Sequence, residues 1–517
     1  MWLHSDWGGG GPLDHLSSKG LPRYFESSRA VREECDRGGG LTFSPIGTTC
    51  RAREKSRSDF LDCLPFLVSI CRHAGDWSMK KVAILGAGLV TEPLAQYLMD
   101  ECGYEVTIAT RTPRKAVQII GGRTKGRAMA WLSVQQDVLD KLVQEVDLVV
   151  SMIPPTMHIP VAKACLRHRK PLVTTSYISP EMQALDAEAR ERGVILLNEV
   201  GEDPGMDHMG AKSMIDKARR EGGRVTSLAS YGAGLPSFEH NRNAVNYKFS
   251  WSPRGVMLAA QTSAEYLVKG EVVKVPAKGL FDHHWLVDIE GLGTFETYPN
   301  RSCLRYLAHF DLEENASLYR GLLRFVGWCN FMQSLIALSY LDDTQTHDLS
   351  GKTFREFTAR LINRPDASME SLSAFLGVPE RADRIKRLKW LGILDNTEIP
   401  LDRGTNIDVI IGLMLARMSY LPGETDMIIV HDEIVVEFDD RKERRISTLH
   451  VEGDPEGHSA MSRAVSLPAA TAVQLILEGK LDLNGVQMPL RPELYEPILE
   501  NLGKLGFNFT HQTMSTV

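Results

Sequence analysis

The chain has 517 residues, too many for one hydrophobic core, so we expect two or three domains. A hydrophobic share of 43% and a charged share of 24% are those of a globular protein. The net charge of −7 lacks the basic excess typical of nucleic-acid-binding proteins. No apolar run approaches the roughly 18 residues of a membrane-spanning helix. We therefore expect a soluble protein with neither a nucleic-acid nor a membrane partner.

Residues 1–78 differ from the rest of the chain. They contain two glycine runs and no sustained hydrophobic period, so we expect mostly disorder there. Their many acidic residues argue against a transit peptide. Because a strand, turn and helix begin just after Met79, we hypothesise that Met79 is the true start and that the preceding sequence is a gene-model extension.

The eight cysteines are scattered and show no CxxC or Cys/His ligand spacing. We expect reduced thiols, a cytoplasmic location and no metal site.

The stretch 80–112 predicts a nucleotide-binding unit. The apolar run 82–85 is followed by a glycine turn, by helical spacing and by a second β-rich run, 106–109. This order is a βαβ unit, the first half of a doubly wound sheet. An ordinary glycine turn in a sheet that binds no nucleotide is the alternative.

The turn sequence is GxGxxT. Gly86 permits the tight turn, and Gly88 lets backbone N–H groups approach a pyrophosphate at the positive end of the helix dipole. Thr91 replaces the usual third glycine, so we expect a looser contact between helix and strand.

The end of the second strand indicates which dinucleotide binds. An NAD site places an acidic residue there for the ribose 2′-hydroxyl, but this strand ends in Thr110, Arg111 and Thr112. An arginine flanked by hydroxyls suits a 2′-phosphate, so we predict NADP. A plain surface arginine is the alternative.

The α/β rhythm continues to about residue 205. Strands are expected at 147–153, 172–177 and 194–197, and helices at 139–145, 158–168 and 180–192. Ligands of such parallel sheets lie at the carboxyl ends of the strands. The segments there are Ile153-Pro154, Thr175–Tyr177 and Asn198–Gly205.

The second half of the chain has a different pattern. We expect a helix to Arg220, a strand over 225–231 that ends in a loop at 232–236, and strands near 272, 285 and 295. Helical spacing begins at Leu318 with Leu322, Phe325 and Val326, and it continues to Met418. Three short strands are expected at 427–430, 434–438 and 446–451, and a helix at 469–478.

The fold class is therefore α/β: a variant Rossmann, doubly wound parallel sheet, with a mixed α/β domain that carries an inserted all-helical subdomain. The expected boundaries are 79–205 with about 457–490 for the nucleotide-binding domain, 206–310 with about 425–456 for the α/β substrate domain, and 311–424 for the helical insertion.

Seven motifs in order resemble the saccharopine dehydrogenase family, in its NADP-dependent, glutamate-forming type. They are GAGLV, TRT, TTSYIS from Thr174, NEVGEDPGMDH from Asn198, YKFSWSPRG from Tyr247, YPNR from Tyr298 and RGLLR from Arg320. The resemblance spans about residues 80–510. It implies oxidation of saccharopine by NADP and water to glutamate, 2-aminoadipate 6-semialdehyde and NADPH, reversibly. It also implies a homodimer formed through the second domain.

The resemblance implies a set of ligand contacts. Cofactor contacts fall on Gly86, Ala87, Gly88, Leu89, Val90, Thr110, Arg111, Thr112, Ser133, Val134, Ile153, Thr175, Ser176, Glu202, Asp203, Pro204 and Ser252. Substrate contacts fall on Ser176, Tyr177, Asp203, Arg301, Leu322, Leu323 and Arg324.

The residue types suit this chemistry. Arg301 and Arg324 can each fork onto a substrate carboxylate, with a solvated surface arginine as the alternative. Tyr177 and Asp203 are the catalytic candidates, because oxidation needs a neutral amine and a base. A core tyrosine is the alternative for Tyr177, and a helix N-cap followed by Pro204 is the alternative for Asp203. His208 is interpreted as a packing residue.

Two positions depart from the family pattern. Many members have cysteine where this chain has Gly232, so no thiol can act there. Ser133-Val134 replaces an Asp-Val pair, which leaves the adenine or ribose contacts open.

Two other functions compete with saccharopine oxidation. One is a related imine reductase, such as carboxynorspermidine dehydrogenase or homospermidine synthase. The other is a non-catalytic protein that senses NADP.

Overall fold

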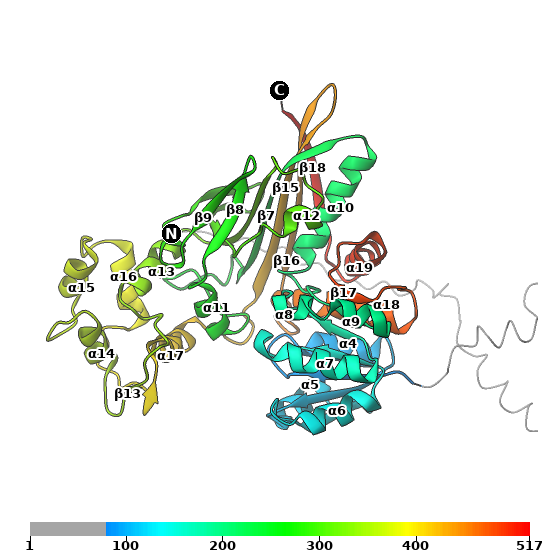
Figure 1. The fold of residues 1–517 in the computed structure, drawn as a ribbon. Helices are drawn as coiled ribbons and strands as arrows, with labels where there is room; N and C mark the ends of the chain where they lie inside the picture. Colours follow the sequence, from blue (N-terminus) through cyan, green and yellow to red (C-terminus); the bar gives the residue numbers. More distant parts are fainter. Residues whose placement is uncertain (1–78, 517) are drawn as a thin grey trace, which may run out of the picture. The chain divides into compact units, whose positions relative to one another are not determined.

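A computed structural model describes residues 79–516 and is drawn in Figure 1. The predictions of disorder and of a gene-model extension for residues 1–78 lie outside the described residues.

The first sheet is a seven-stranded, fully parallel sheet in the order β17-β6-β5-β4-β1-β2-β3. Its strands are β1 (Lys81–Leu85), β2 (Glu105–Thr110), β3 (Gly126–Ala130), β4 (Leu148–Ser151), β5 (Leu172–Thr174), β6 (Ile195–Leu197) and β17 (Gly485–Gln487). The order reverses next to β1, which is the mark of a doubly wound sheet. The predicted fold class is confirmed.

Helices alternate with these strands. They are α4 (Glu92–Asp100), α5 (Pro113–Ile120), α6 (Gln136–Glu145), α7 (His158–His168), α8 (Pro180–Gln183) and α9 (Asp186–Arg192). The single helix expected over 180–192 is therefore two helices. The strand expected to reach Tyr177 ends at Thr174, and residues 175–177 turn away from the ladder toward the segment that follows β6, where Glu199 N donates to Ser176 O (3.1 Å).

The second sheet has nine strands and is mixed. Its main path is β10-β11-β12-β7-β15-β16-β18, and a β8–β9 hairpin pairs with β12. The strands are β7 (Arg224–Pro236), β8 (Ala264–Val268), β9 (Glu271–Val275), β10 (Trp285–Ile289), β11 (Gly293–Pro299), β12 (Ser317–Arg324), β15 (Asp426–Glu437), β16 (Lys442–Glu452) and β18 (Thr510–Thr516). Helix α10 (Met206–Arg220) covers one face of this sheet by packing on β7 and β15.

The helix predicted from Leu318 to Val326 is wrong. Residues 317–324 form β12, which pairs in parallel with β7 and antiparallel with β11. The leucines at 318 and 322 have helical spacing, but Arg320, Leu322 and Arg324 share one face of the strand, in its two-residue period, and nearly all of the segment is buried. The strand period describes this segment because it lies between two other strands.

Two further predictions in this sheet are wrong. The loop expected at Gly232 is part of β7, where Gly232 pairs with Val430. The two strands expected at 427–430 and 434–438 form one continuous β15, because the intervening His431, Asp432 and Glu433 keep their places in the ladder.

Helices fill the sequence between β12 and β15, apart from a two-stranded ladder of β13 (His347–Asp348) and β14 (Arg403–Gly404). They are α13 (Trp328–Ala337), α14 (Phe354–Leu361), α15 (Met369–Leu376), α16 (Asp383–Leu391) and α17 (Asn406–Met418). Figure 1 shows them as a group in yellow-green beside the strands of the second sheet.

Helix α18 (Ala460–Leu477) begins nine residues earlier than the predicted start at 469. Among the described helices it alone has the length and hydropathy of a membrane span, but 72% of it is buried inside the protein. It packs against α4, β15 and α19 (Pro492–Lys504), as a core helix does.

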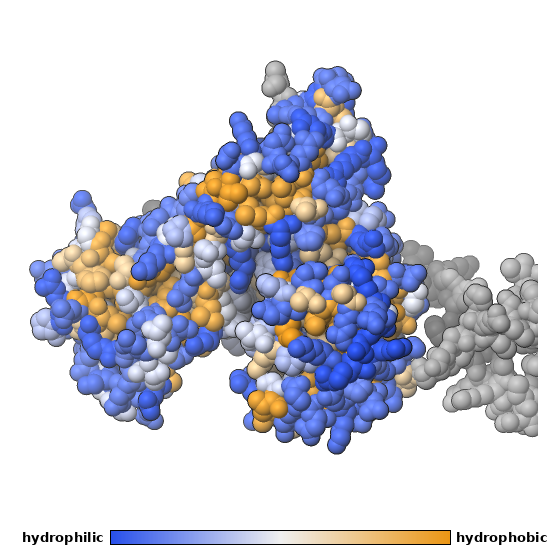
Figure 2. All heavy atoms as spheres, viewed as in Figure 1, coloured by the Kyte–Doolittle hydropathy of each residue, from blue (hydrophilic) through white to orange (hydrophobic). Residues whose placement is uncertain are grey.

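The surface carries an apolar area over the β8–β9 hairpin (Figure 2). Val268 and Val272 of this hairpin are each 45% exposed. Two short helices, α11 (Pro253–Ala259) and α12 (Tyr306–His309), connect the strands nearby.

Candidate active site

The turn after β1 has the geometry of a phosphate cradle. Gly86 has φ = +111°, and a Cβ there would lie 2.7 Å from the carbonyl oxygen of Met152, so the position requires glycine. Gly88 and Leu89 are exposed in front of the N-terminus of α4. This exposed backbone at the positive end of a helix fits the pyrophosphate of a dinucleotide.

Thr91 occupies the third position of the fingerprint and is fully buried. Its hydroxyl oxygen accepts a hydrogen bond from Gly88 N (3.1 Å). The threonine side chain thus ties the turn to the start of the helix, and the expected looser contact between helix and strand stays a prediction.

The end of β2 is open to solvent. Arg111 and Thr112 are exposed, while Thr110 is buried. Ser133 is half-buried, and Val134 is 82% exposed in the loop after β3. An exposed guanidinium next to β2 is free to meet a 2′-phosphate.

Asp203 is held by three side chains. Its carboxylate accepts hydrogen bonds from the Tyr177 hydroxyl, from Arg320 (2.6 Å) and from Asn300 Nδ2 (3.1 Å). The predicted pair of Tyr177 and Asp203 is therefore brought together, although the two residues follow different strands. The alternative of an N-cap is wrong: α10 begins at Met206, and Asp203 makes no capping bond.

A buried ion network extends behind Asp203. Arg320 also donates to Asp207 Oδ2 (2.5 Å). The two ring nitrogens of His208 lie 3.0 Å from Asp207 Oδ2 and 3.1 Å from Glu199 Oε2. Arg305 donates to Glu199 Oε1 (2.5 Å). His208 is thus a structural link between two carboxylates.

The pKa values in this network follow from burial and from the partners. Burial alone would raise the pKa of Asp207, but the charges of His208 and Arg320 hold it well below its usual range. Burial would also raise the pKa of Glu199, but the hydrogen bond and ion pair with His208 lower that pKa to about 2. Burial lowers the pKa of His208, but Asp207 more than compensates and raises it.

Arg301 and Arg324 both face this site. The Arg301 guanidinium lies 5.5 Å from the centre of the Tyr177 ring. Arg324 is 4% exposed and lies 5.4 Å from the ring of Tyr247 and 5.9 Å from that of Tyr298. Its hydrogen bond goes to the Leu323 carbonyl oxygen (2.7 Å), and within residues 79–516 it forms no ion pair. A buried cation without an anion is costly unless a ligand supplies one.

Polar atoms without a protein partner gather around Arg324 and Asp203. Among the described residues they include Glu202 Oε1, Tyr247 OH, Ser250 Oγ and the Nε atoms of Arg320 and Arg324. Buried polar groups in a native protein are normally paired, so this concentration indicates a place for ligand atoms or water.

Glu202 differs from the other acids of the site. Burial, and then the charges of Asp203 and Asp207, raise its pKa well above the usual range. Its uncharged form is therefore favoured more than that of an ordinary glutamate. Gly232 lies beside it: a Cβ there would be 3.1 Å from Asp203 Oδ2 and 3.6 Å from Glu202 Oε1.

The other predicted contacts lie on different elements. Leu322 is half-buried and pairs with Gly232, whereas the Leu323 side chain is buried on the opposite face of β12. Ile153 and Thr175 are half-buried after β4 and β5. Ser252 caps α11 by accepting a hydrogen bond from Gly255 N (3.2 Å) and has no recorded contact with the Asp203 network.

Sequence reasoning missed several residues of the site: Glu199, Asp207, Asn300, Arg305, Arg320 and, after β4, His158. All but Arg305 and His158 lie inside the motifs that carry the resemblance. The signal for Arg320 was its spacing of four residues from Arg324, which places both on one face of a strand.

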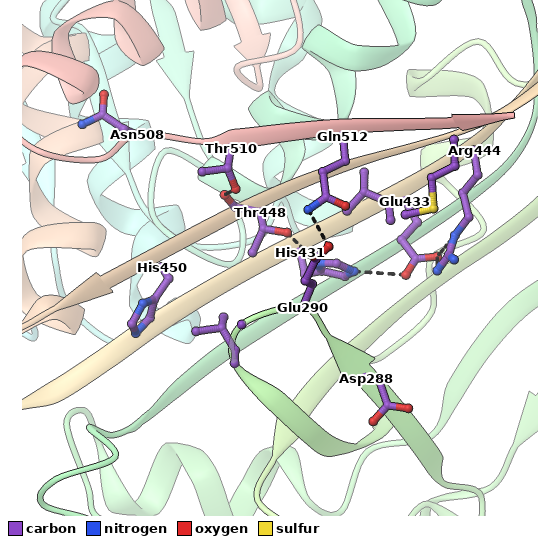
Figure 3. A pocket seen from close by; sticks show the side chains of 14 residues that line it. Asp288, Glu290, His431, Glu433, Arg444, Thr448, His450, Asn508, Thr510 and Gln512 are labelled. Carbon is purple, nitrogen blue, oxygen red and sulfur yellow. Dashed lines mark hydrogen bonds and ion pairs between the residues drawn. The ribbon is translucent and has the colours of Figure 1, made fainter.

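Two other cavities lie away from this site. The one in Figure 3, of about 410 Å³, is lined by β15, β16, β18 and the β10–β11 turn. Glu433 there accepts from Arg444 and lies 3.0 Å from His431 Nε2, and Glu290 accepts from Gln512 Nε2 (3.0 Å). The second, of about 460 Å³, lies at the opposite end of the first sheet, beside Lys81 and Glu105.

Comparisons with known proteins agree with this arrangement. A family model described as the saccharopine dehydrogenase NADP binding domain matches residues 82–197. The model of the saccharopine dehydrogenase C-terminal domain matches residues 201–507.

Whole proteins match as well. Saccharopine dehydrogenase [NADP(+), L-glutamate-forming] of Schizosaccharomyces pombe is 33% identical over 84% of this chain and 99% of its own length. Mitochondrial alpha-aminoadipic semialdehyde synthase of Bos taurus is 32% identical over 85% of this chain but only 49% of its own length. The structure of apo saccharopine dehydrogenase (L-Glu forming) from Saccharomyces cerevisiae superposes with a TM-score of 0.76, at 31% identity, over 84% of this chain and all of that one.

Proposed function

Because this chain belongs to the saccharopine dehydrogenase family, we propose that it oxidises saccharopine with NADP and water to L-glutamate, L-2-aminoadipate 6-semialdehyde, NADPH and a proton, in a reversible reaction. The observation that carries the proposal is Arg324, a buried guanidinium without an ion pair within residues 79–516. Saccharopine has three carboxylates, and one of them would supply the missing anion.

The charge of the site favours an acidic substrate. Four guanidinium groups, from Arg301, Arg305, Arg320 and Arg324, gather near three carboxylates with ion-pair partners, those of Glu199, Asp203 and Asp207. Burial raises the pKa of Glu202, which favours its uncharged form and so reduces the negative charge that it adds. The site therefore has a surplus of positive charge. This surplus disfavours a cationic polyamine as the ligand, and so it disfavours an imine reductase that forms polyamines.

The cofactor is NADP. The turn at Gly86–Val90 would hold its pyrophosphate, and Arg111 with Thr112 would hold its 2′-phosphate. When bound, it would take a hydride from the carbon next to the secondary amine that becomes the aldehyde carbon of the semialdehyde.

The protein's own residues handle the remaining steps. Arg301 and Arg324 bind substrate carboxylates and so fix the position of the amine. Loss of hydride from the carbon beside the neutral amine, with loss of the N–H proton, gives an imine. Water adds to the imine carbon, and the resulting carbinolamine breaks at its C–N bond to release the semialdehyde and, after protonation of the nitrogen, glutamate. The Tyr177–Asp203 pair would exchange protons with the amine and with the attacking water, and its contacts with Arg320 and Asn300, which hold it in position, support this role.

We further propose a cytoplasmic homodimer. The resemblance to the family supports the dimer, and the exposed Val268 and Val272 supply an apolar surface on the second sheet. Sedimentation equilibrium of the purified chain measures its mass in solution, and a monomer at all concentrations would refute the dimer.

The test of the function is steady-state formation of NADPH from saccharopine, with NAD and with a carboxylated polyamine as comparison substrates. We expect turnover with saccharopine and NADP. Binding of NADPH without turnover of either substrate would instead identify an NADP-sensing protein.

A further inference from the structure

His158 begins α7 and is buried beneath the carboxyl ends of β4 and β5. Its Nδ1 lies 2.8 Å from Ser151 Oγ, and its Nε2 lies 2.9 Å from Ser176 Oγ. We infer that His158 is a positioning residue that makes the Ser176 hydroxyl a hydrogen-bond donor to a bound ligand. The inference rests on the proposed function for the identity of that ligand.

The positions of the protons in the hydrogen-bonded series Ser151, His158 and Ser176 can be assigned. Burial lowers the pKa of His158 to about 4, so the ring is neutral near pH 7 and carries one N–H. Ser151 is fully buried, and its hydroxyl has no hydrogen-bond partner among residues 79–516 other than Nδ1. If Nδ1 carried the proton, the Ser151 hydroxyl hydrogen would be buried without an acceptor, which is costly.

The ring therefore accepts from Ser151 at Nδ1 and donates from Nε2 to Ser176. Thr174 Oγ1 is a second, longer contact of Nε2, at 3.3 Å. Because the Ser176 oxygen already accepts from the ring, its own hydrogen is left for another partner. Ser176 is half-buried, and it follows β5 at the edge of the sheet where ligands of parallel sheets bind.

The group that Ser176 meets must be an acceptor oxygen. A carboxylate of the substrate and the amide carbonyl of the cofactor both qualify, and the two assays below distinguish them. A ligand group that can only donate does not fit.

A matched pair of variants tests the assignment. His158→Gln can still donate to Ser176 from the position of Nε2, whereas His158→Asn reaches only the Ser151 side. We measure the Kd of NADPH by fluorescence, kcat and KM for saccharopine, and the melting temperature. We expect His158→Asn to weaken binding of NADPH or to raise the KM for saccharopine roughly 5- to 10-fold, with His158→Gln within about 2-fold of the wild type.

A double-mutant cycle with Ser176→Ala separates positioning from packing. Ser176→Ala should cause the same loss as His158→Asn, and the double variant should lose nothing more. Ser151→Ala leaves His158 in place but removes the donor that fixes the ring, so a smaller loss in the same direction is expected. If His158→Asn does not fold, Ser151→Ala provides the test of the inference in its place.

Additive losses in the cycle, or lower melting temperatures with unchanged Kd and KM, would overturn the inference. If the wild type binds NADPH but does not oxidise saccharopine, the proposed function fails. The cycle on the Kd of NADPH then decides the role of His158 by itself.

Discussion

The two sheets approach the site with different chemistry. The carboxyl edge of the first sheet presents a glycine turn, the hydroxyls of Thr175 and Ser176, and the exposed Arg111. The second sheet presents Arg320 and Arg324, both buried. Arg111 is exposed and the two hydroxyls are half-buried, so changing one of these three side chains should alter ligand binding with little effect on folding. Buried charges depend on one another, so changing one should alter binding and folding together.

Arg320 gives the largest expected effect. Arg320→Met would leave Asp203 and Asp207 buried without their cation, which should lower the free energy of unfolding by about 3–5 kcal/mol. Urea unfolding measures the change. Arg224→Met is the control, because its ion pairs with Glu313 and Glu437 lie at the surface, with one-third to one-half of each side chain exposed, and should each contribute no more than about 1 kcal/mol. Both residues lie in the second sheet, so equal midpoints for the two variants would contradict the expectation that buried charges there depend on one another while exposed ones do not.

Arg301 and Arg111 lie on the two sides of the site, and their variants can be compared by the ligand whose KM each one raises. Both are exposed, so Arg301→Ala and Arg111→Ala should fold normally. Each variant loses one charge-assisted hydrogen bond to a ligand, so we expect the KM for that ligand to rise roughly 10- to 100-fold. Arg301→Ala should raise the KM for saccharopine, and Arg111→Ala the KM for NADP but not for NAD.

Steady-state kinetics with each substrate varied in turn measure these effects. If Arg111→Ala raised the KM for NAD and NADP equally, the 2′-phosphate would not be its partner. If Arg301→Ala changed the KM for NADP instead, the division of the site between the two sheets would be wrong.

The first sheet could be predicted from the sequence because its signals are local. Strand, turn and helix follow one another within the stretch 80–112, and the hydrophobic period changes at the glycines. The second sheet could not be predicted as well, because its strands pair over long distances and carry polar residues inside. In β12 the leucines suggested a helix, while the buried Arg320 and Arg324 mark a strand between two others.

The residues of the site likewise divide into those that the sequence predicted and those that only the folded structure shows. Arg324, Asp203 and Tyr177 were found through motifs, but no local pattern shows that Arg320 would join Asp203 to Asp207. That contact depends on how β12 lies against the segment after β6, which only the folded structure gives.

Asp432 gives a smaller effect that depends on pH. It lies behind the site on β15, and burial raises the pKa of its carboxyl well above the usual range. The native state therefore keeps a proton that the unfolded chain releases above about pH 4. The stability is complete below that pH and falls as the pH rises toward the folded pKa.

Asp432→Asn should abolish this fall, with a gain on the order of 1–2 kcal/mol at pH 8 and little change at pH 4. Unfolding in urea across this range measures it, and Asp439→Asn, in the exposed turn after β15, should leave the profile unchanged. The assignment would be contradicted if the stability of the wild type rose between pH 5 and pH 8 while that of Asp432→Asn did not.

Gly232 gives the smallest effect and tests how closely the two sheets approach. A Cβ at this position would lie 3.1 Å from Asp203 Oδ2, so Gly232→Ala must displace the carboxylate by a few tenths of an ångström. Since catalysis is sensitive to the position of reacting groups, kcat should fall roughly several-fold, with little loss of stability. Gly412→Ala is the control. It lies within α17 with no atom within 4 Å of the added Cβ, so it should stabilise the protein by about 0.5–1 kcal/mol and leave kcat unchanged. An unchanged kcat in Gly232→Ala would show that Asp203 can move without cost, and the Tyr177–Asp203 pair would then be a structural element of the interface between the sheets and not part of the chemistry.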